Sequence, residues 1–251
     1  MGIKFLNILK IAVGEIVMVV IGILLALQIN NWNEEQKIEI EEMSILENLL
    51  DNLKSAKGQS ENFITQEEKL KQSLLLALEK STSKYELNLN SITDSIFYEL
   101  LWNFEEGVPV INSYSDLKNT GKVTIIKNAD IRKHFNNLEL NINGLRFFTA
   151  DRLAVQQLRV DDIAINNINF VRLLNVQDSK FNIDNESTND YRSILANPKT
   201  RNALATKLEL TNKVIHYRHD LGIEINNLID RLQVEIISRK GNEALTVPKL
   251  H

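Results

Sequence analysis

The chain of 251 residues contains no cysteine, and this absence removes several classes of site. Without thiols the protein has no disulfide, no Cys-ligated zinc, no thiolate-bound iron–sulfur cluster and no cysteine nucleophile. Glycine is also scarce, and no two of the nine glycines lie within five residues of each other. A Walker A loop or a dinucleotide-binding loop needs closely spaced glycines, so both nucleotide sites are excluded.

Two further catalytic motifs and an excess of positive charge are also missing. Neither the zinc-binding pattern H-E-x-x-H nor the hydrolase pattern G-x-S-x-G occurs. The 29 basic and 33 acidic residues leave a net charge of −4. A chain of this charge is a poor binder of nucleic acid, because phosphate neutralisation requires a basic surface. We therefore expect no catalysis, no cofactor and no nucleic-acid partner.

A long apolar run stands near the N-terminus. Residues 11–29 read IAVGEIVMVVIGILLALQI, interrupted only by Glu15 and Gln28. At helical rise this run spans about 28 Å, close to the roughly 30 Å hydrocarbon core of a bilayer. The run is longer than the apolar part of a cleaved signal peptide, and no A-x-A-like site follows it. A buried helix of a soluble protein is the other alternative. The sequence predicts a retained transmembrane helix over 11–29.

Charges on the two sides of the run indicate its orientation. Lys4 and Lys10 precede it, whereas six glutamates and a single lysine follow it up to residue 50. Because lysine and arginine favour the cytoplasmic side, residues 1–10 are expected to form a short cytoplasmic tail, with the bulk outside the cytoplasm. Trp32 stands just past the run, where an interfacial aromatic anchor belongs.

One stripe of the predicted span combines a carboxylate with small side chains. The residues on or beside this stripe are Ala12, Gly14, Glu15, Gly22 and Ala26. Small residues let helix backbones approach closely in lipid, and a carboxylate in such a contact is hydrogen-bonded or protonated. We therefore expect this helix to self-associate or to bind another membrane protein. In the alternative interpretation, Glu15 reaches the headgroups near Lys10 and the small residues are incidental.

Two stretches of the sequence resemble a known family. Residues 14–34 read GEIVMVVIGILLALQINNWNE, which is similar to the opening of small single-pass membrane proteins of Gram-negative bacteria, a domain of unknown function. A weaker similarity covers Ser113, Tyr114, Leu117, Lys118 and Gly121, followed by Ile126, Asn128, Ile131 and Arg132. The resemblance implies a membrane protein of such a bacterium, which with the predicted orientation means its inner membrane. It implies no activity.

The rest of the chain has the pattern of long helices. Apolar residues recur at three- and four-residue steps over 30–81, and again in two long helices of residues 128–251, at about 129–172 and 198–240. A polar loop joins these two, and residues 82–127 hold short helices and a corner. No turn interrupts the chain between the span and residue 34. The predicted fold is all-α: an N-terminal transmembrane helix that continues into an antiparallel extracytoplasmic helical bundle.

Charged residues along these helices are expected to face solvent. The glutamates between residues 34 and 47 form one such face. Arg146, Arg152 and Arg159 form a basic seam beside acidic neighbours, for which an exposed face is again the expectation. The alternative for this seam is contact with an acidic partner.

Residues 113–132 have the signals of a structural corner, carried by Ser113, Tyr114, Gly121 and Asn128. Ser113 and Asp116 have the spacing of a capping box, Gly121 stands where a helix C-cap belongs, and Asn128 can cap the next helix. Residues 123–126 are expected to be extended. A binding loop is the alternative, but local caps account for these residues.

Candidate metal chemistry rests on two histidines. His216 and His219 lie three residues apart on the last predicted helix, and His134 or Glu139 can supply a third ligand from a facing helix. The alternative is a pair of partly exposed polar residues. A calcium site at residues 178–189 departs from the EF-hand spacing. A Ser-His-Asp triad, which depends on spatial closeness, stays open.

Three functions follow, in decreasing order of support. The first is a membrane-anchored module, a scaffold or sensory ectodomain, that self-associates or docks a partner without catalysis. The second is a subunit or accessory of an oligomeric pore or transporter, lined by Glu15, Gln28, Asn30 and Asn31. The third is a metal-dependent enzyme that uses His216 and His219. The expected partners are the lipid bilayer and a second copy or another membrane protein.

Overall fold

The protein is elongated and built from helices. A computed structural model describes the backbone of residues 2–80, 92–177 and 182–246, and the side chains of residues 15–79, 92–176 and 182–241. The long helices are α1 (Gly2–Lys80), α4 (Ala129–Val155) and α8 (Pro198–Thr246). The shorter elements are α2 (Asp94–Trp102), α3 (Asn112–Asn119), the 3-10 turn η2 (Lys122–Ile125), the π-turn η3 (Gln156–Val160), α5 (Asp161–Asn167), α6 (Phe170–Gln177) and α7 (Tyr191–Ala196). The predicted all-α class is confirmed.

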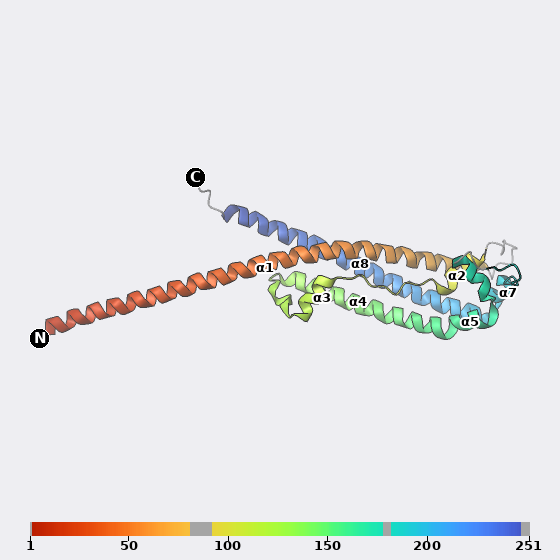
Figure 1. The fold of residues 1–251 in the computed structure, drawn as a ribbon, viewed down its shortest axis with the longest axis horizontal. Helices are drawn as coiled ribbons and strands as arrows, with labels where there is room; N and C mark the ends of the chain where they lie inside the picture. The colour runs from red at the N-terminus through yellow and green to blue at the C-terminus, as the bar shows by residue number, and fades with distance from the viewer. Residues whose placement is uncertain (1, 81–91, 178–181, 247–251) are drawn as a thin grey trace.

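α1 has a free half and a bundle half. Every residue from 15 to 40 is exposed, and this half extends away from the rest of the protein (Figure 1). By length and composition α1 is apolar enough to cross a membrane, and none of its most apolar window is buried. The bundle half buries one face at steps of three, four or seven residues: Glu42, Leu46, Leu49, Leu53, Ala56, Ser60, Glu67, Leu70, Leu74 and Ala77. This spacing is that of a helix seam.

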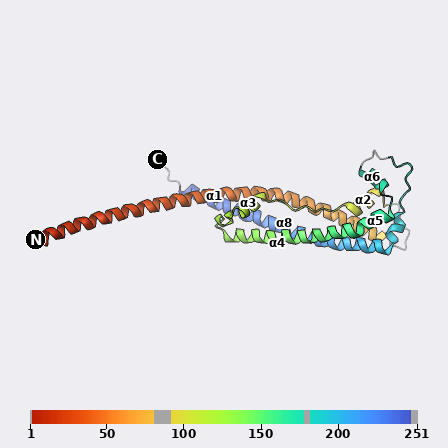
Figure 2. The same ribbon diagram turned by 60° about the horizontal axis from the view of Figure 1, so that its bottom comes forward.

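α8 is the central helix of the bundle. It runs antiparallel to α1 and α4, and it packs along the bundle half of α1 on one side and along α4 on the other (Figure 2). α8 begins at Pro198, where Asn197 Oδ1 accepts a hydrogen bond from the amide of Lys199 at 2.8 Å. Proline suits this first helical position, because its missing N–H would have no partner inside the helix.

The helix predicted over 129–172 is shorter in the structure. α4 passes through the π-turn η3 into α5, which ends at Asn167, and Ile168 is extended. The amide of Asn169 donates to Asn189 Oδ1 at 2.6 Å, and the Asn169 side chain donates to Glu186 at 2.6 Å. These contacts with a distant loop take the place of the next helical turn. The apolar periodicity of the sequence therefore continues past the residue where the helix ends.

Other predicted boundaries also move. The last helix was expected to end at about residue 240, before Gly241, but α8 continues to Thr246. Gly241 lies inside the helix and does not have the positive φ of a helix C-cap. The short helix expected from about residue 91 begins at Asp94, capped by Thr93, whose hydroxyl accepts from the amide of Ile96 at 3.3 Å. The polar break predicted at 82–90 and Asp178 of the calcium alternative lie outside the described residues.

The core of the bundle consists of two apolar clusters. One lies toward the free half of α1 and includes Leu46, Leu53, Phe135, Leu221 and Leu228. The other lies toward the far end and includes Leu70, Leu74, Phe97, Val160 and Leu204. Between them the buried residues are polar: Ser60, Glu67, Thr149, Arg152, Gln156, Lys207, Thr211 and Arg218. This polar layer is the main departure from an ordinary helical core.

Candidate functional site

The polar layer holds a buried ion pair between α1 and α4. The Arg152 guanidinium donates two hydrogen bonds to the Glu67 carboxylate, at 2.5 and 2.8 Å, and both side chains are fully buried. Arg218 of α8 lies 3.4 Å from the same carboxylate. Glu67 therefore compensates two buried guanidinium groups, which makes it the electrostatic centre of the layer.

The same cations hold an extended segment, residues 103–111, against the bundle. Arg152 and Arg218 each donate to the Glu105 carbonyl at 2.8 Å, and Arg218 also donates to the Gly107 carbonyl at 2.9 Å. Gly107 is needed for this close approach, because a Cβ atom there would stand 2.7 Å from the ring of Phe63. The segment thus crosses the bundle on carbonyl groups bonded to buried arginines.

Lys207 supplies the third buried cation. Its ammonium group donates to the carbonyls of Leu100 and Leu101 at 2.9 and 2.7 Å, and to Gln156 Oε1 at 3.1 Å. Leu100 and Leu101 belong to the last turn of α2, where carbonyls lack intrahelical partners and favour a cation. Burial, together with the nearby charge of Arg152, lowers the pKa of Lys207 to about 7. Burial also lowers the pKa of Arg218.

Sequence reasoning missed this layer and misplaced one of its members. Arg152 was expected on an exposed basic face with Arg146 and Arg159, but it is 1% exposed, whereas the other two are exposed. Glu67, Lys207 and Arg218 were not singled out at all. The signal that could have found them is positional, because each stands at a three- or four-residue step from apolar core residues.

The acidic run of α1 is mostly exposed, as expected, but several of its glutamates have partners and one is buried. Glu39, Glu41 and Glu47 pair with Lys127, Lys122 and Lys240, at 3.3, 2.7 and 2.7 Å. Glu42 is fully buried and accepts two hydrogen bonds from Arg239, at 2.7 and 2.9 Å. The acidic run therefore joins α1 to the corner and to the end of α8.

The corner contains α3, η2 and the start of α4. Asn128 caps α4, with its Oδ1 accepting from the amides of Asp130 and Ile131 at 3.0 and 3.2 Å. Gly121 has φ +71°, in the left-handed region. Tyr114 is buried and stacks on Phe135, with ring centroids 4.4 Å apart.

Two details of the predicted corner are wrong. Ser113 does not cap α3: the cap position is Ile111, which lies two residues earlier, and the Ser113 amide donates to Asn52 Oδ1 at 3.3 Å. Asn52 comes from α1, so a tertiary contact takes the place of the local capping box. Residues 123–126, expected to be extended, lie mostly within the 3-10 turn η2, and only Ile126 is extended.

We expect that Gly121→Ala lowers the free energy of unfolding by about 1 kcal/mol, because a Cβ atom disfavours the left-handed conformation. No atom stands within 4 Å of the added Cβ, so the loss is conformational. Gly58→Ala is the matched control: Gly58 lies inside α1 with the same free space, and alanine there should raise stability by about 0.5–1 kcal/mol. Chemical denaturation measures the change in unfolding free energy of both variants. A change in the same direction in both would contradict the left-handed conformation of Gly121.

The described residues of the predicted packing stripe lie on the free half of α1. At about 100° per residue, Gly22 and Ala26 lie within about 20° of Glu15 around the helix axis. All three are exposed, Trp32 is 63% exposed, and no atom stands within 4 Å of a Cβ built at Gly22. The side chains of Ala12 and Gly14 lie outside the described set.

The two candidate metal ligands are not joined by a third. His216 is 73% exposed and faces Asp220 at 3.4 Å, and His219 is exposed. His134 instead pairs with Glu224 at 2.5 Å, and Glu139 pairs with Lys118. Within the described side chains, no group of three or more histidine, aspartate or glutamate residues is placed to hold a metal ion.

Comparison with known proteins identifies a family but no activity. Residues 15–143 match the Family of unknown function (DUF6090), a region that covers α1 from Glu15 to the middle of α4. No curated protein and no solved structure matches the chain. The expected resemblance to a family of unknown function is confirmed at that level. Since the match covers more than half of the chain, this protein belongs to the family of unknown function DUF6090.

Proposed function

We propose that this protein is a membrane-anchored helical module that self-associates through the free half of α1. One observation carries the proposal: a single uninterrupted helix joins a fully exposed apolar segment to the seam of a packed bundle. The lysines before the segment and the glutamates after it favour a cytoplasmic N-terminus and an extracytoplasmic bundle in a bacterial inner membrane.

The exposed side chains support a lipid environment for this segment. Between Ile16 and Ile29 the large apolar side chains are 47–78% exposed. Each such side chain gains about 1.5–3 kcal/mol when it is fully transferred from water into an apolar medium. The bundle supplies no partner for this part of α1, so a bilayer is the medium that accounts for it.

Self-association is supported by the stripe of Glu15, Gly22 and Ala26. In lipid the apolar side chains gain nothing from leaving the hydrocarbon, and helices associate by close backbone packing and hydrogen bonds instead. A carboxylate in the membrane is costly unless it faces a protein contact. The stripe places both features on one face.

We expect Gly22→Leu to weaken self-association by about 1–2 kcal/mol, because leucine keeps the helices apart. Since the chain has no cysteine, the readout is oxidative cross-linking of a single Ala26→Cys in detergent-solubilised full-length protein. Wild-type background should form a disulfide-linked dimer, and Gly22→Leu should remove most of it. Val20→Leu is the matched control, because Val20 lies about 160° from Gly22 around the helix axis, and it should have no effect. A monomer in every background would refute the proposal.

The two other classes have less support. In a pore lined by Glu15, Gln28, Asn30 and Asn31, these residues would need to share a face, but Gln28 and Asn31 lie about 140° and 160° from Glu15 around the axis. For a metal-dependent enzyme, His216 and His219 are exposed without a third ligand within the described side chains. The proposal therefore stays with a non-catalytic anchored module.

A further inference from the structure

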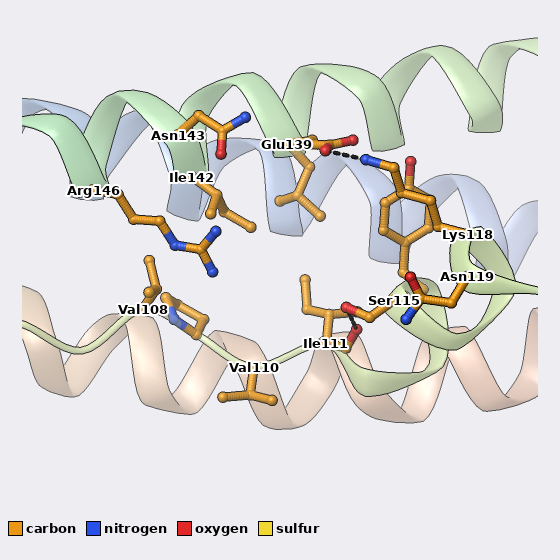
Figure 3. A pocket seen from close by; sticks show the side chains of 13 residues that line it. Val108, Val110, Ile111, Ser115, Lys118, Asn119, Glu139, Ile142, Asn143 and Arg146 are labelled. Carbon is orange, nitrogen blue, oxygen red and sulfur yellow. Dashed lines mark hydrogen bonds and ion pairs between the residues drawn. The ribbon is translucent and has the colours of Figure 1, made fainter.

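A cavity lies between the extended segment, α3 and α4 (Figure 3). Its volume is about 420 Å³, within the range of about 300–1,000 Å³ common for small-molecule sites. The apolar residues of its lining, together called the floor, are Val108, Pro109, Val110, Ile111, Tyr114, Leu138 and Ile142. α3, which lines the cavity, lies near the end of the bundle from which the free half of α1 emerges (Figure 1).

The charges around this cavity are unbalanced. At one end Lys118 pairs with Glu139, and this hydrogen bond raises the pKa of Lys118, so the pair is neutral overall. At the other end the Arg146 guanidinium points into the cavity (Figure 3) and has no ion-pair or hydrogen-bond partner among the described side chains. A guanidinium stays charged and binds carboxylate or phosphate through two parallel hydrogen bonds.

We propose that the cavity binds a small anionic amphiphile, a carboxylate or phosphate monoester that carries a medium-length alkyl chain. Arg146 binds the anionic group, and the alkyl chain lies on the apolar floor toward Ile111 and Tyr114. A free inorganic anion would use the arginine and leave the floor exposed to water, whereas a neutral amphiphile would leave the guanidinium unpaired. Only a ligand with both parts satisfies the whole surface. This site does not depend on whether α1 self-associates.

The test is photo-cross-linking of the full-length protein in a non-ionic detergent with a diazirine derivative of octanoate. Mass spectrometry of the digested protein locates the label. We expect labelled peptides from residues 108–119 and 138–146, in addition to non-specific labelling of the apolar half of α1. Labelling of α1 alone would overturn the proposal.

Variants separate the two parts of the site. Arg146→Gln should reduce labelling of the cavity peptides by roughly tenfold, the size of one lost charge-assisted interaction, and Arg146→Lys should restore part of it. Ile142→Trp should fill the cavity and remove the label while the charge stays. Arg159→Gln is the matched control, since Arg159 is also exposed but lies outside the cavity. Equal loss in Arg159→Gln would refute a specific site, and thermal melts of each variant identify any that fail to fold.

Competition distinguishes the ligand classes. Unlabelled octanoate and octyl phosphate should both compete for the cavity peptides, and the stronger competitor identifies the headgroup. Octanol and inorganic phosphate should compete at least tenfold less well, because each provides only one part of the ligand. Equal competition by octanol would show a purely apolar cavity, and equal competition by inorganic phosphate would show a free-anion site. Either result would overturn the proposed amphiphile.

Discussion

Glu67→Gln is expected to lower the free energy of unfolding by about 3–5 kcal/mol, the usual loss when one member of a buried ion pair is removed. Glu67 is the only carboxylate within 4 Å of the buried Arg152 and Arg218 guanidinium groups in the described residues. Its neutralisation leaves two buried guanidinium groups with no carboxylate within 4 Å among the described residues. Chemical denaturation of the full-length protein in a mild detergent measures the change.

Glu68→Gln is the matched control for this prediction. Glu68 is the next residue, is 37% exposed at its side chain, and pairs with Lys71 at 3.4 Å. An exposed pair of this kind contributes about 0–1 kcal/mol, so the control should remain close to the wild type. Comparable losses in Glu67→Gln and Glu68→Gln would show that the polar layer is not sealed from water.

A double variant tests whether Glu67 acts through Arg152. The combination Glu67→Gln/Arg152→Leu removes the carboxylate together with its bidentate partner, so the second substitution should cost less than it does alone. We expect a coupling free energy of roughly 1.5–3 kcal/mol. Strict additivity would contradict the arrangement of the pair.

Lys207→Met should change how stability depends on pH. The pKa of Lys207 is about 7 in the folded protein and 10.5 for an ordinary lysine. Between these values the unfolded chain holds a proton that the folded chain has released, so the contribution of Lys207 to stability rises with pH. The slope reaches at most about 1.4 kcal/mol per pH unit, and the contribution is constant below about pH 7.

The expected result is a stability difference, variant minus wild type, that is largest near pH 6 and falls steadily between pH 7 and pH 10. Methionine also leaves the carbonyls of Leu100 and Leu101 without their donor, which adds a constant loss to the variant. The informative quantity is therefore the change with pH. Lys213→Met is the control, because Lys213 is 46% exposed and pairs with Glu209. A pH-independent difference for Lys207→Met would mean that Lys207 keeps its ordinary pKa.

The fold was largely predictable because its main signals are local. The scarcity of proline and the three- and four-residue steps of apolar residues predict the long helices, and Asn128 predicts where α4 begins. The end of the helix predicted to residue 172 was wrong because Asn189 and Glu186, far along the chain, bind Asn169. A local pattern carries no information about such contacts.

The contacts of the polar layer were not predictable for a related reason. Pattern reading assigns charged residues to the solvent face, and Arg152 was therefore expected outside. Its partner Glu67 lies 85 residues earlier in the chain. Periodicity can place these residues on the core side of their helices, but only the packed bundle reveals that Arg152, Glu67 and the carbonyls of the extended segment satisfy one another.

The central position of α8 has a consequence for the order in which the protein can fold during synthesis. At about 5–20 residues per second, roughly 8–30 s separate the synthesis of Lys80 from that of Ile236. Until α8 is made, the seams of α1 and α4 lack the helix that they share, and Glu42 lacks Arg239, which comes 197 residues later. Until then the chain has two partial cores, one on α1 and one on α4, and it becomes a stable bundle only when its last long helix arrives.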